Sequence, residues 1–287
     1  MGMVNKHKFL MAFLGVVVAA VIVFIITNNS NYNNLSGAEK VDQFSGKTVG
    51  VMLAWESDYA LTARKDLNIL RYDQLPDMVM ALQHDRIDAI ALDALTAKTV
   101  LFMTDGLEIV PPIYGQYGYV AAFGRNEKEL CDDYDAFLRE YIRTDEYQDL
   151  QRRISEFDGH KFDGKIIRPT GTGRTITVAC NESGFPSTYY DYANDCWVGS
   201  DYEPFITWAN ARNYKVEITG TVYEDMIMGV FRGRYEMIIG FLSELYQDDF
   251  DTFGINHSIP LNPIGIYFLV KSKNGISTSY GLYEEFE

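Results

Sequence analysis

The sequence has little cysteine, little histidine and few positive charges for its length. Its 287 residues include three cysteines and four histidines, and 40 acidic residues stand against 25 basic ones. Cysteines this few, without CxxC spacing, cannot build a disulfide scaffold or a structural zinc site. The net charge of −15 would repel nucleic acid at long range. No P-loop or dinucleotide-binding glycine pattern follows an expected strand, so we expect no cofactor and no metal.

The remaining composition is that of a globular protein with a substantial core. Hydrophobic residues make up 47% of the chain and charged residues 23%, which argues against disorder and fibrous repeats. The length suits one two-lobed domain or two small ones. Cys180 and Cys196 could pair in an exported protein, but we expect buried free thiols, because free cysteine is among the most buried residue types.

A long uncharged run lies near the N-terminus. Residues 9–27 are almost wholly apolar and, as a helix, would span about 28 Å, nearly the thickness of a bilayer core. Lys6 and Lys8 precede the run, and no basic residue follows before Lys40. This asymmetry predicts a cytoplasmic N-terminus and a body outside the cytoplasm, at the cell surface or in the periplasm. An uncleaved single-pass anchor is favoured over a signal peptide, because no A-x-A-like cleavage site follows.

The body alternates expected strands with expected helices. Residues 47–53 and 87–93 form apolar strand patterns on either side of an amphipathic helix pattern at 75–85, and residues 113–123 form a further strand. A helical stretch follows from 127 to about 157. After a linker, a second unit begins, in which strands at 175–180, 215–220 and 235–243 alternate with helices at 202–213 and 224–232. Two such α/β units facing a cleft would place a ligand at the carboxyl ends of their strands.

Several phrases of the sequence resemble one known family. QFSGKTVGVM at 43–52, ALQHDRIDAIALD at 81–93 and the strand and helices of 118–154 are similar to the second lobe and C-terminal part of amino-acid-binding extracytoplasmic solute-binding proteins, the receptors of ABC importers. The segment 175–243 and the strand 264–271 resemble the lobe that normally comes first. The resemblance therefore implies an α/β, two-lobed, type II periplasmic-binding-protein-like fold, with a hinge, an interlobe cleft, an exchanged lobe order and an N-terminal transmembrane helix.

The exchanged order has two explanations. The tail at 276–287 and the stretch before Gly46 both resemble the phrase that leads into the second lobe, which favours circular permutation. Two half-domains left from a degraded tandem receptor are the alternative. The expected divisions are an anchor or uncleaved signal at 1–30, a stalk at 31–43, lobe two at 44–117, a return strand and terminal helices that pack on lobe one at 118–157, a linker at 158–174, lobe one at 175–270 and a tail at 271–287.

The resemblance also implies a ligand site, from which an important residue is missing. The family pairs the ammonium of an amino acid with an Asp that ends the second-lobe strand, and Asp93 matches it; helix capping is its other possible role. An Arg usually holds the carboxylate, but Asp248 stands in that position, and no Lys or Arg occurs from 235 to 270. A buried carboxylate without a cationic partner costs several kcal/mol. The cleft therefore favours a cationic or neutral ligand, such as an amine or a peptide amino end.

Other candidate contacts come from loops aligned with the family's ligand-binding turns. A bulky, acidic turn replaces the family's small anion-binding turn in lobe two, and an Asn and a Phe stand in the first loop of lobe one. The expected ligand-binding residues, besides Asp93, are Trp55, Glu56, Ser57, Asn181, Phe185, Tyr223, Phe241 and Ser243. Each aromatic in this set has core packing as its alternative role, because the chain holds 40 aromatic residues.

These observations predict a membrane-tethered receptor of an ABC importer or a sensory system. It would close two lobes on an amino acid, an amine or a short peptide, and it would pass the solute or a signal to a membrane permease or sensor partner. The alternative is a receptor-like interaction or sensor module that has lost amino-acid binding. We expect no enzyme, because His7, His84, His160 and His257 form no catalytic constellation in the sequence.

Overall fold

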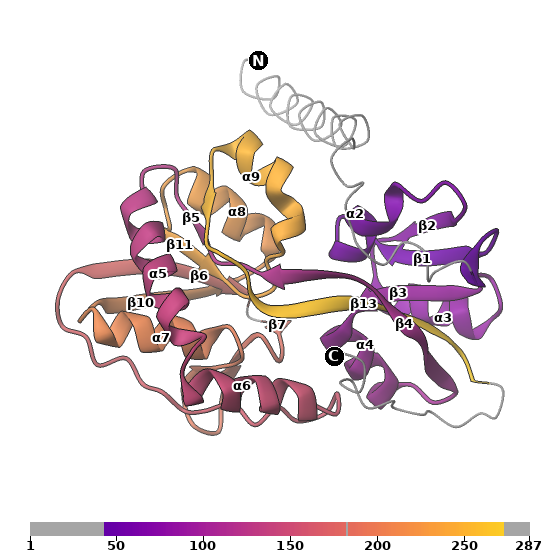
Figure 1. The fold of residues 1–287 in the computed structure, drawn as a ribbon, viewed down its shortest axis with the longest axis horizontal. Helices are drawn as coiled ribbons and strands as arrows, with labels where there is room; N and C mark the ends of the chain where they lie inside the picture. The colour runs from indigo at the N-terminus through magenta and orange to yellow at the C-terminus, as the bar shows by residue number, and fades with distance from the viewer. Residues whose placement is uncertain (1–42, 182, 273–287) are drawn as a thin grey trace, which may run out of the picture. The chain divides into compact units, whose positions relative to one another are not determined.

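A computed structural model describes residues 43–181 and 183–272 of the chain. In this part the fold is α/β, and its two five-stranded sheets each carry helices (Figure 1). The expected anchor and most of the stalk and tail lie outside the described residues. Among the described residues, no helix has the length and apolar character needed to cross a membrane.

The first sheet belongs to lobe two and has the strand order β2-β1-β3-β13-β4. Strands β1, β2 and β3 are parallel, and β13 joins them antiparallel to β3. All five residues of β3 are buried, as expected of a central strand covered on both faces. The elements of this lobe are β1 (Thr48–Met52), α2 (Glu56–Thr62), β2 (Asn68–Tyr72), α3 (Leu75–Gln83), β3 (Ala89–Asp93), α4 (Ala94–Met103) and β4 (Leu107–Tyr119).

The second sheet belongs to lobe one and repeats this plan, in the order β10-β6-β11-β5-β12. Strands β10, β6 and β11 are parallel, and β5 lies antiparallel beside β11. The elements of this lobe, before β13, are β5 (Ala122–Phe123), α5 (Lys128–Tyr141), α6 (Asp145–Glu156), β6 (Thr175–Asn181), α7 (Tyr202–Ala211), β10 (Lys215–Thr221), α8 (Tyr223–Phe231), β11 (Met237–Ile239), η2 (Glu244–Tyr246), α9 (Gln247–Phe253) and β12 (Asn256–His257). A small sheet adds β7 (Ser183–Gly184), β8 (Thr188–Asp191) and β9 (Cys196–Val198).

Two long strands connect the sheets. β4 leads from lobe two to β5 of lobe one, and β13 (Leu261–Lys271) returns from lobe one into the sheet of lobe two. They pair antiparallel from Leu261 opposite Tyr119 to Lys271 opposite Leu107, with irregularities in register, and can be followed side by side in Figure 1. Each sheet therefore receives one strand from a segment that crosses between the lobes.

The lobes have separate apolar cores. In lobe two, residues of α3, β3 and α4 pack on β13. In lobe one, α5 and α7 cover one face of the sheet around Trp208, and α8 and α9 cover the other face around Phe250. Arg153 of α6 is anchored to α7 by a buried two-pronged ion pair with Glu203.

A buried lysine joins the lobes at a second place. Lys98 of α4 donates to the backbone oxygens of Ser155 and Phe157, at the C-terminal end of α6. The last carbonyls of a helix have no partner within the helix, so an ammonium group is a suitable donor there. Burial lowers the pKa of Lys98 to about 8, and the nearby charge of Asp158 opposes this shift.

The described elements confirm most of the expected strands and helices. The expected helical stretch from 127 to 157 is two helices, because the chain turns at residues 142–144, where Thr144 caps α6 by accepting from the Tyr147 amide. The expected strand at 235–243 is shorter, since Gly240 and Phe241 have positive φ angles of 97° and 54° and leave the extended conformation. Cys131, Cys180 and Cys196 are buried thiols that form no disulfide within the described residues, as expected.

Candidate ligand site between the lobes

Two carboxylates from lobe two are buried side by side. Glu56 begins α2 directly after the loop that follows β1, and Asp93 ends β3; their residues are 5% and 2% exposed. Burial, followed by the charge of Asp93, raises the pKa of Glu56 to about 8. Burial also raises the pKa of Asp93. Neither carboxylate forms an ion pair with a basic side chain among the described residues.

Asp93 combines two properties. Its Oδ1 accepts from the amides of Leu95 and Thr96, both at 3.0 Å, and so caps α4. These hydrogen bonds favour the charged form, and burial still outweighs them in setting the pKa. Asp93 therefore has the capping role considered from the sequence, and it also lies beside Glu56, where a ligand contact remains a prediction.

Tyrosines surround the carboxylate pair. Tyr117 and Tyr119 of β4 are buried, and the charges of Glu56 and Asp93, after burial itself, raise the pKa of both phenols. The Tyr119 hydroxyl favours the charged form of Asp93 but makes no complete hydrogen bond. From lobe one, Tyr246 of η2 directs its hydroxyl toward Glu56.

Further contacts cross from one lobe to the other beside this pair. The Tyr59 hydroxyl of α2 donates to Asp249 of α9 at 2.6 Å, and its ring lies 5.0 Å from that of Tyr246. The Gly118 amide donates to Glu244 at 2.6 Å. The carboxylate pair is thus enclosed between the lobes by residues of lobe one.

Unpartnered polar atoms mark the same place. Among the described residues, the buried hydroxyls of Ser57, Tyr117 and Tyr119 have no hydrogen-bond partner. Buried polar groups are nearly always satisfied, and leaving one without a partner costs about 1–3 kcal/mol. These three hydroxyls therefore leave hydrogen-bonding capacity unused in the same part of the fold as the two carboxylates, and the Ser200 hydroxyl, next to Asp201, is a fourth.

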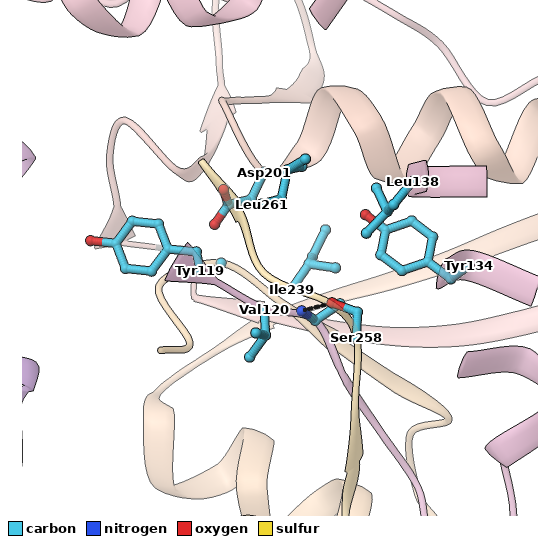
Figure 2. Close-up of a pocket in the computed structure, with 10 residues that line it drawn as sticks. Tyr119, Val120, Tyr134, Leu138, Asp201, Ile239, Ser258 and Leu261 are labelled. Atoms are coloured by element: carbon cyan, nitrogen blue, oxygen red, sulfur yellow. Dashed lines mark hydrogen bonds between the residues drawn. The ribbon is translucent and has the colours of Figure 1, made fainter. Parts of the chain in front are cut away.

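A small pocket of about 20 Å³, with room for about one water molecule, adjoins this region where β4 enters lobe one. It contains Tyr119, Tyr134, Asp201 and Ser258 in its lining. In Figure 2 the carboxylate of Asp201 lies toward Tyr119, while Tyr134 and Leu138 lie on the other side. Burial raises the pKa of Asp201, although Ser187, the Phe241 amide and Asn262 donate to it.

Tyr223 and Phe241 lie near the carboxylate pair or its tyrosines. The ring of Tyr223 meets Tyr246 edge-on at 6.3 Å, and the charge of Glu56 contributes to the raised pKa of the Tyr223 phenol, after burial and Asp249. Phe241 packs edge-on against Tyr119 at 5.3 Å. These two join Glu56, Ser57 and Asp93 as expected contacts that the fold brings together.

The other four expected contacts have different surroundings. Trp55 is 36% exposed and precedes α2. The Ser243 hydroxyl accepts from the Leu245 amide at 3.1 Å and so caps η2. The Asn181 carbonyl accepts a hydrogen bond from the Thr188 hydroxyl of β8. The Phe185 ring, in the loop between β7 and β8, packs against the rings of Phe157 and Tyr189.

Comparison with known proteins gives structural likeness only. No protein-family model matches the sequence, and no curated protein matches it. A ligand-binding component of an ABC-type import system from Staphylococcus aureus, solved with zinc bound, is 10% identical at a TM-score of 0.42. This match covers 79% of this chain and 66% of that one, so the chain spans just under two thirds of its length.

Two further solved structures are similar at the same level. The probable amino-acid ABC transporter extracellular-binding protein YtmK from Bacillus subtilis is 10% identical, with a TM-score of 0.40, over 78% of this chain and 83% of that one. The regulatory domain of OxyR2 from Vibrio vulnificus is 12% identical, with a TM-score of 0.41, over 79% and 87%. At these values the matches are statements of likeness, and the functional interpretation depends on the side chains.

Proposed function

We propose that the chain is a membrane-tethered extracytoplasmic receptor that closes two lobes on a small amino-acid-like or cationic solute. The observation that carries this proposal is the enclosed Glu56–Asp93 pair, which lies between the lobes with unpartnered hydroxyls around it. A scaffold role needs no such group, since buried charge without a partner destabilises a fold.

The order of the strands supports a circular permutation as part of this proposal. Both sheets have the same order, and each takes its fourth strand from the crossing segment. The chain enters in lobe two, crosses to β5, continues through α5 and α6, and only then forms β6 of lobe one. The segment 158–174 would then connect the positions that are the C-terminus and the N-terminus in the unpermuted chain order.

The remaining parts of the proposal come from the sequence. The apolar run at 9–27 and the lysines before it support an anchor with an external body. A permease of an ABC importer, or a sensor protein, would recognise the ligand-bound form of this chain. We include no catalytic step; the ring nitrogens of His257 contact Gln247 and the Ser258 carbonyl.

The alternative is an interaction or sensor module without a small ligand. The Tyr59–Asp249 hydrogen bond favours it, because this contact holds the lobes together with the protein's own groups. The two functions differ in what happens when a solute is added, and this difference can be measured.

The test is a thermal melt of the full chain in detergent against amino acids, amines, short peptides and sugars. A ligand at 100 times its dissociation constant adds about 2.7 kcal/mol, or several degrees for a domain of this size. We expect a shift with one chemical class, and its loss in Glu56→Gln but not in the exposed Glu217→Gln. A cooperative melt that no class shifts would contradict the receptor and favour the interaction module.

A further inference from the structure

Among residues 43–181 and 183–272, no basic side chain forms an ion pair with the Glu56–Asp93 pair. Asp58, which follows Ser57 in α2, turns away and pairs with Arg71 and Thr62. In α4, Lys98 is committed to the end of α6. The groups around the pair are phenols: Tyr117 and Tyr119 from lobe two respond to both carboxylates, and Tyr223 and Tyr246 from lobe one respond to Glu56. Two further acids lie beside these phenols, Asp201 by Tyr119 and Asp249 by Tyr223.

This composition limits the protonation of the pair. Two buried carboxylates whose charges act on each other cannot both remain ionised without a cation, because repulsion adds to the loss of hydration. A shared proton removes one of the two charges. The raised pKa of Glu56, about 8, agrees with a proton held there at neutral pH. Because the charge of each carboxylate affects the protonation of the other, this proton belongs to the pair.

Resting on the proposed function, we propose that the empty site holds one proton between Glu56 and Asp93 and exchanges it for the ammonium group of an organic amine that has no free carboxylate. The ammonium enters, one proton leaves to solvent, and the net charge of the site stays at minus one. No covalent bond changes.

The unpartnered hydroxyls provide acceptors for the incoming ammonium group. An ammonium group has three donors, and the two carboxylates with Tyr117 or Ser57 present oxygen acceptors that are otherwise unused. The surrounding phenol rings suit the alkyl part of an amine and can add cation–π attraction. A zwitterion would place its own carboxylate among acids and phenols without a basic partner, and should be rejected.

The first experiment measures the proton in the empty protein. Infrared difference spectra of the full chain across pH 5–10 should show a protonated carboxyl band that disappears near pH 8. The band should be missing in Glu56→Gln and unchanged in the exposed control Glu217→Gln. Absence of the band from the empty wild-type protein at pH 6–7 would overturn the inference, whether or not any ligand is known.

The second experiment measures the exchange by calorimetry with butylamine, 1,4-diaminobutane and glutamine as probes. We expect an amine to bind with release of about one proton at pH 6.5, seen as a heat that depends on the ionisation enthalpy of the buffer. At pH values below the pKa of the pair, the affinity should rise about tenfold for each unit by which the pH is increased. Glu56→Gln should abolish the proton release, and Asp93→Asn, which keeps the cap of α4, should weaken amine binding.

The results separate this inference from the proposed function. Binding of glutamine in preference to the amines, or amine binding with no dependence on buffer, would overturn the exchange and leave a solute receptor in place. A protonated pair in a protein that binds none of the probes and shows no melt shift with any class would count against the receptor itself.

Discussion

Two buried charged clusters in this protein are built in opposite ways. Arg153 and Glu203 of lobe one form a two-pronged ion pair at 2.7 and 2.6 Å, and the pair has further partners in Asp149, the Asp163 carbonyl and the Lys165 amide. Glu56 and Asp93 of lobe two are as deeply buried, but their charges have the same sign. The first cluster is complete within the protein, and the second is not.

The difference shows how buried charge can be assigned to structure or to binding. Each charged atom of Arg153 and Glu203 has a partner, so this cluster fixes α6 against α7. Around Glu56 and Asp93, charges remain uncompensated and hydroxyls remain unpartnered. Burial alone does not distinguish the clusters, whereas a census of partners does.

The largest expected effect comes from breaking the complete cluster. Arg153→Met leaves Glu203 buried without a cation, and we expect it to lower the free energy of unfolding by about 3–5 kcal/mol in urea titrations. Arg152→Met is the matched control, because the neighbouring Arg152 pairs with Asp149 and Glu156 in solvent. It should cost little, and equal losses in the two variants would contradict the structural role of the buried pair.

The incomplete cluster should respond to pH. Glu56 has an ordinary pKa of 4.5 in the unfolded chain and about 8 in the fold. Its bound proton therefore stabilises the fold fully below about pH 4.5, and this stabilisation is lost as the pH rises through 8. The loss should be about 5 kcal/mol by urea titration. Glu56→Gln should remove this part of the pH dependence, and a wild-type curve that matches the variant would refute the raised pKa.

The smallest effect separates the two properties of Asp93. Asparagine can accept from the amides of Leu95 and Thr96 as aspartate does, whereas alanine cannot. We expect Asp93→Ala to be less stable than Asp93→Asn by about 1 kcal/mol in thermal melts. If the two variants melt alike, the side chain contributes to stability only through its charge.

The sequence predicts the alternation of strands and helices well, and the candidate site in part. Apolar runs such as residues 47–53 and 87–93 are long enough to identify β1 and β3, and the acid at the end of a buried strand identifies Asp93. The bulky, acidic turn after β1 identifies Glu56 as a candidate. These signals are local, so they can be read without knowledge of the packing.

The rest of the site depends on packing between segments distant in sequence. Tyr246 reaches Glu56 from almost 200 residues away, and only the fold distinguishes it from the other tyrosines. Tyr117 and Tyr119 share one face of β4, since they are two residues apart, and this spacing was a usable signal. Nothing local shows that the hydroxyl of Ser243 caps η2, because a serine before a helical turn and a serine facing a ligand look alike in sequence.

Lys98 constrains how the two lobes can move. The two connecting strands and the Tyr59–Asp249 and Gly118–Glu244 hydrogen bonds already join the lobes. The ammonium of Lys98 adds an attachment between α4 and the end of α6. Any movement that separates α4 from the end of α6 leaves the buried ammonium of Lys98 and the carbonyls of Ser155 and Phe157 without these hydrogen bonds.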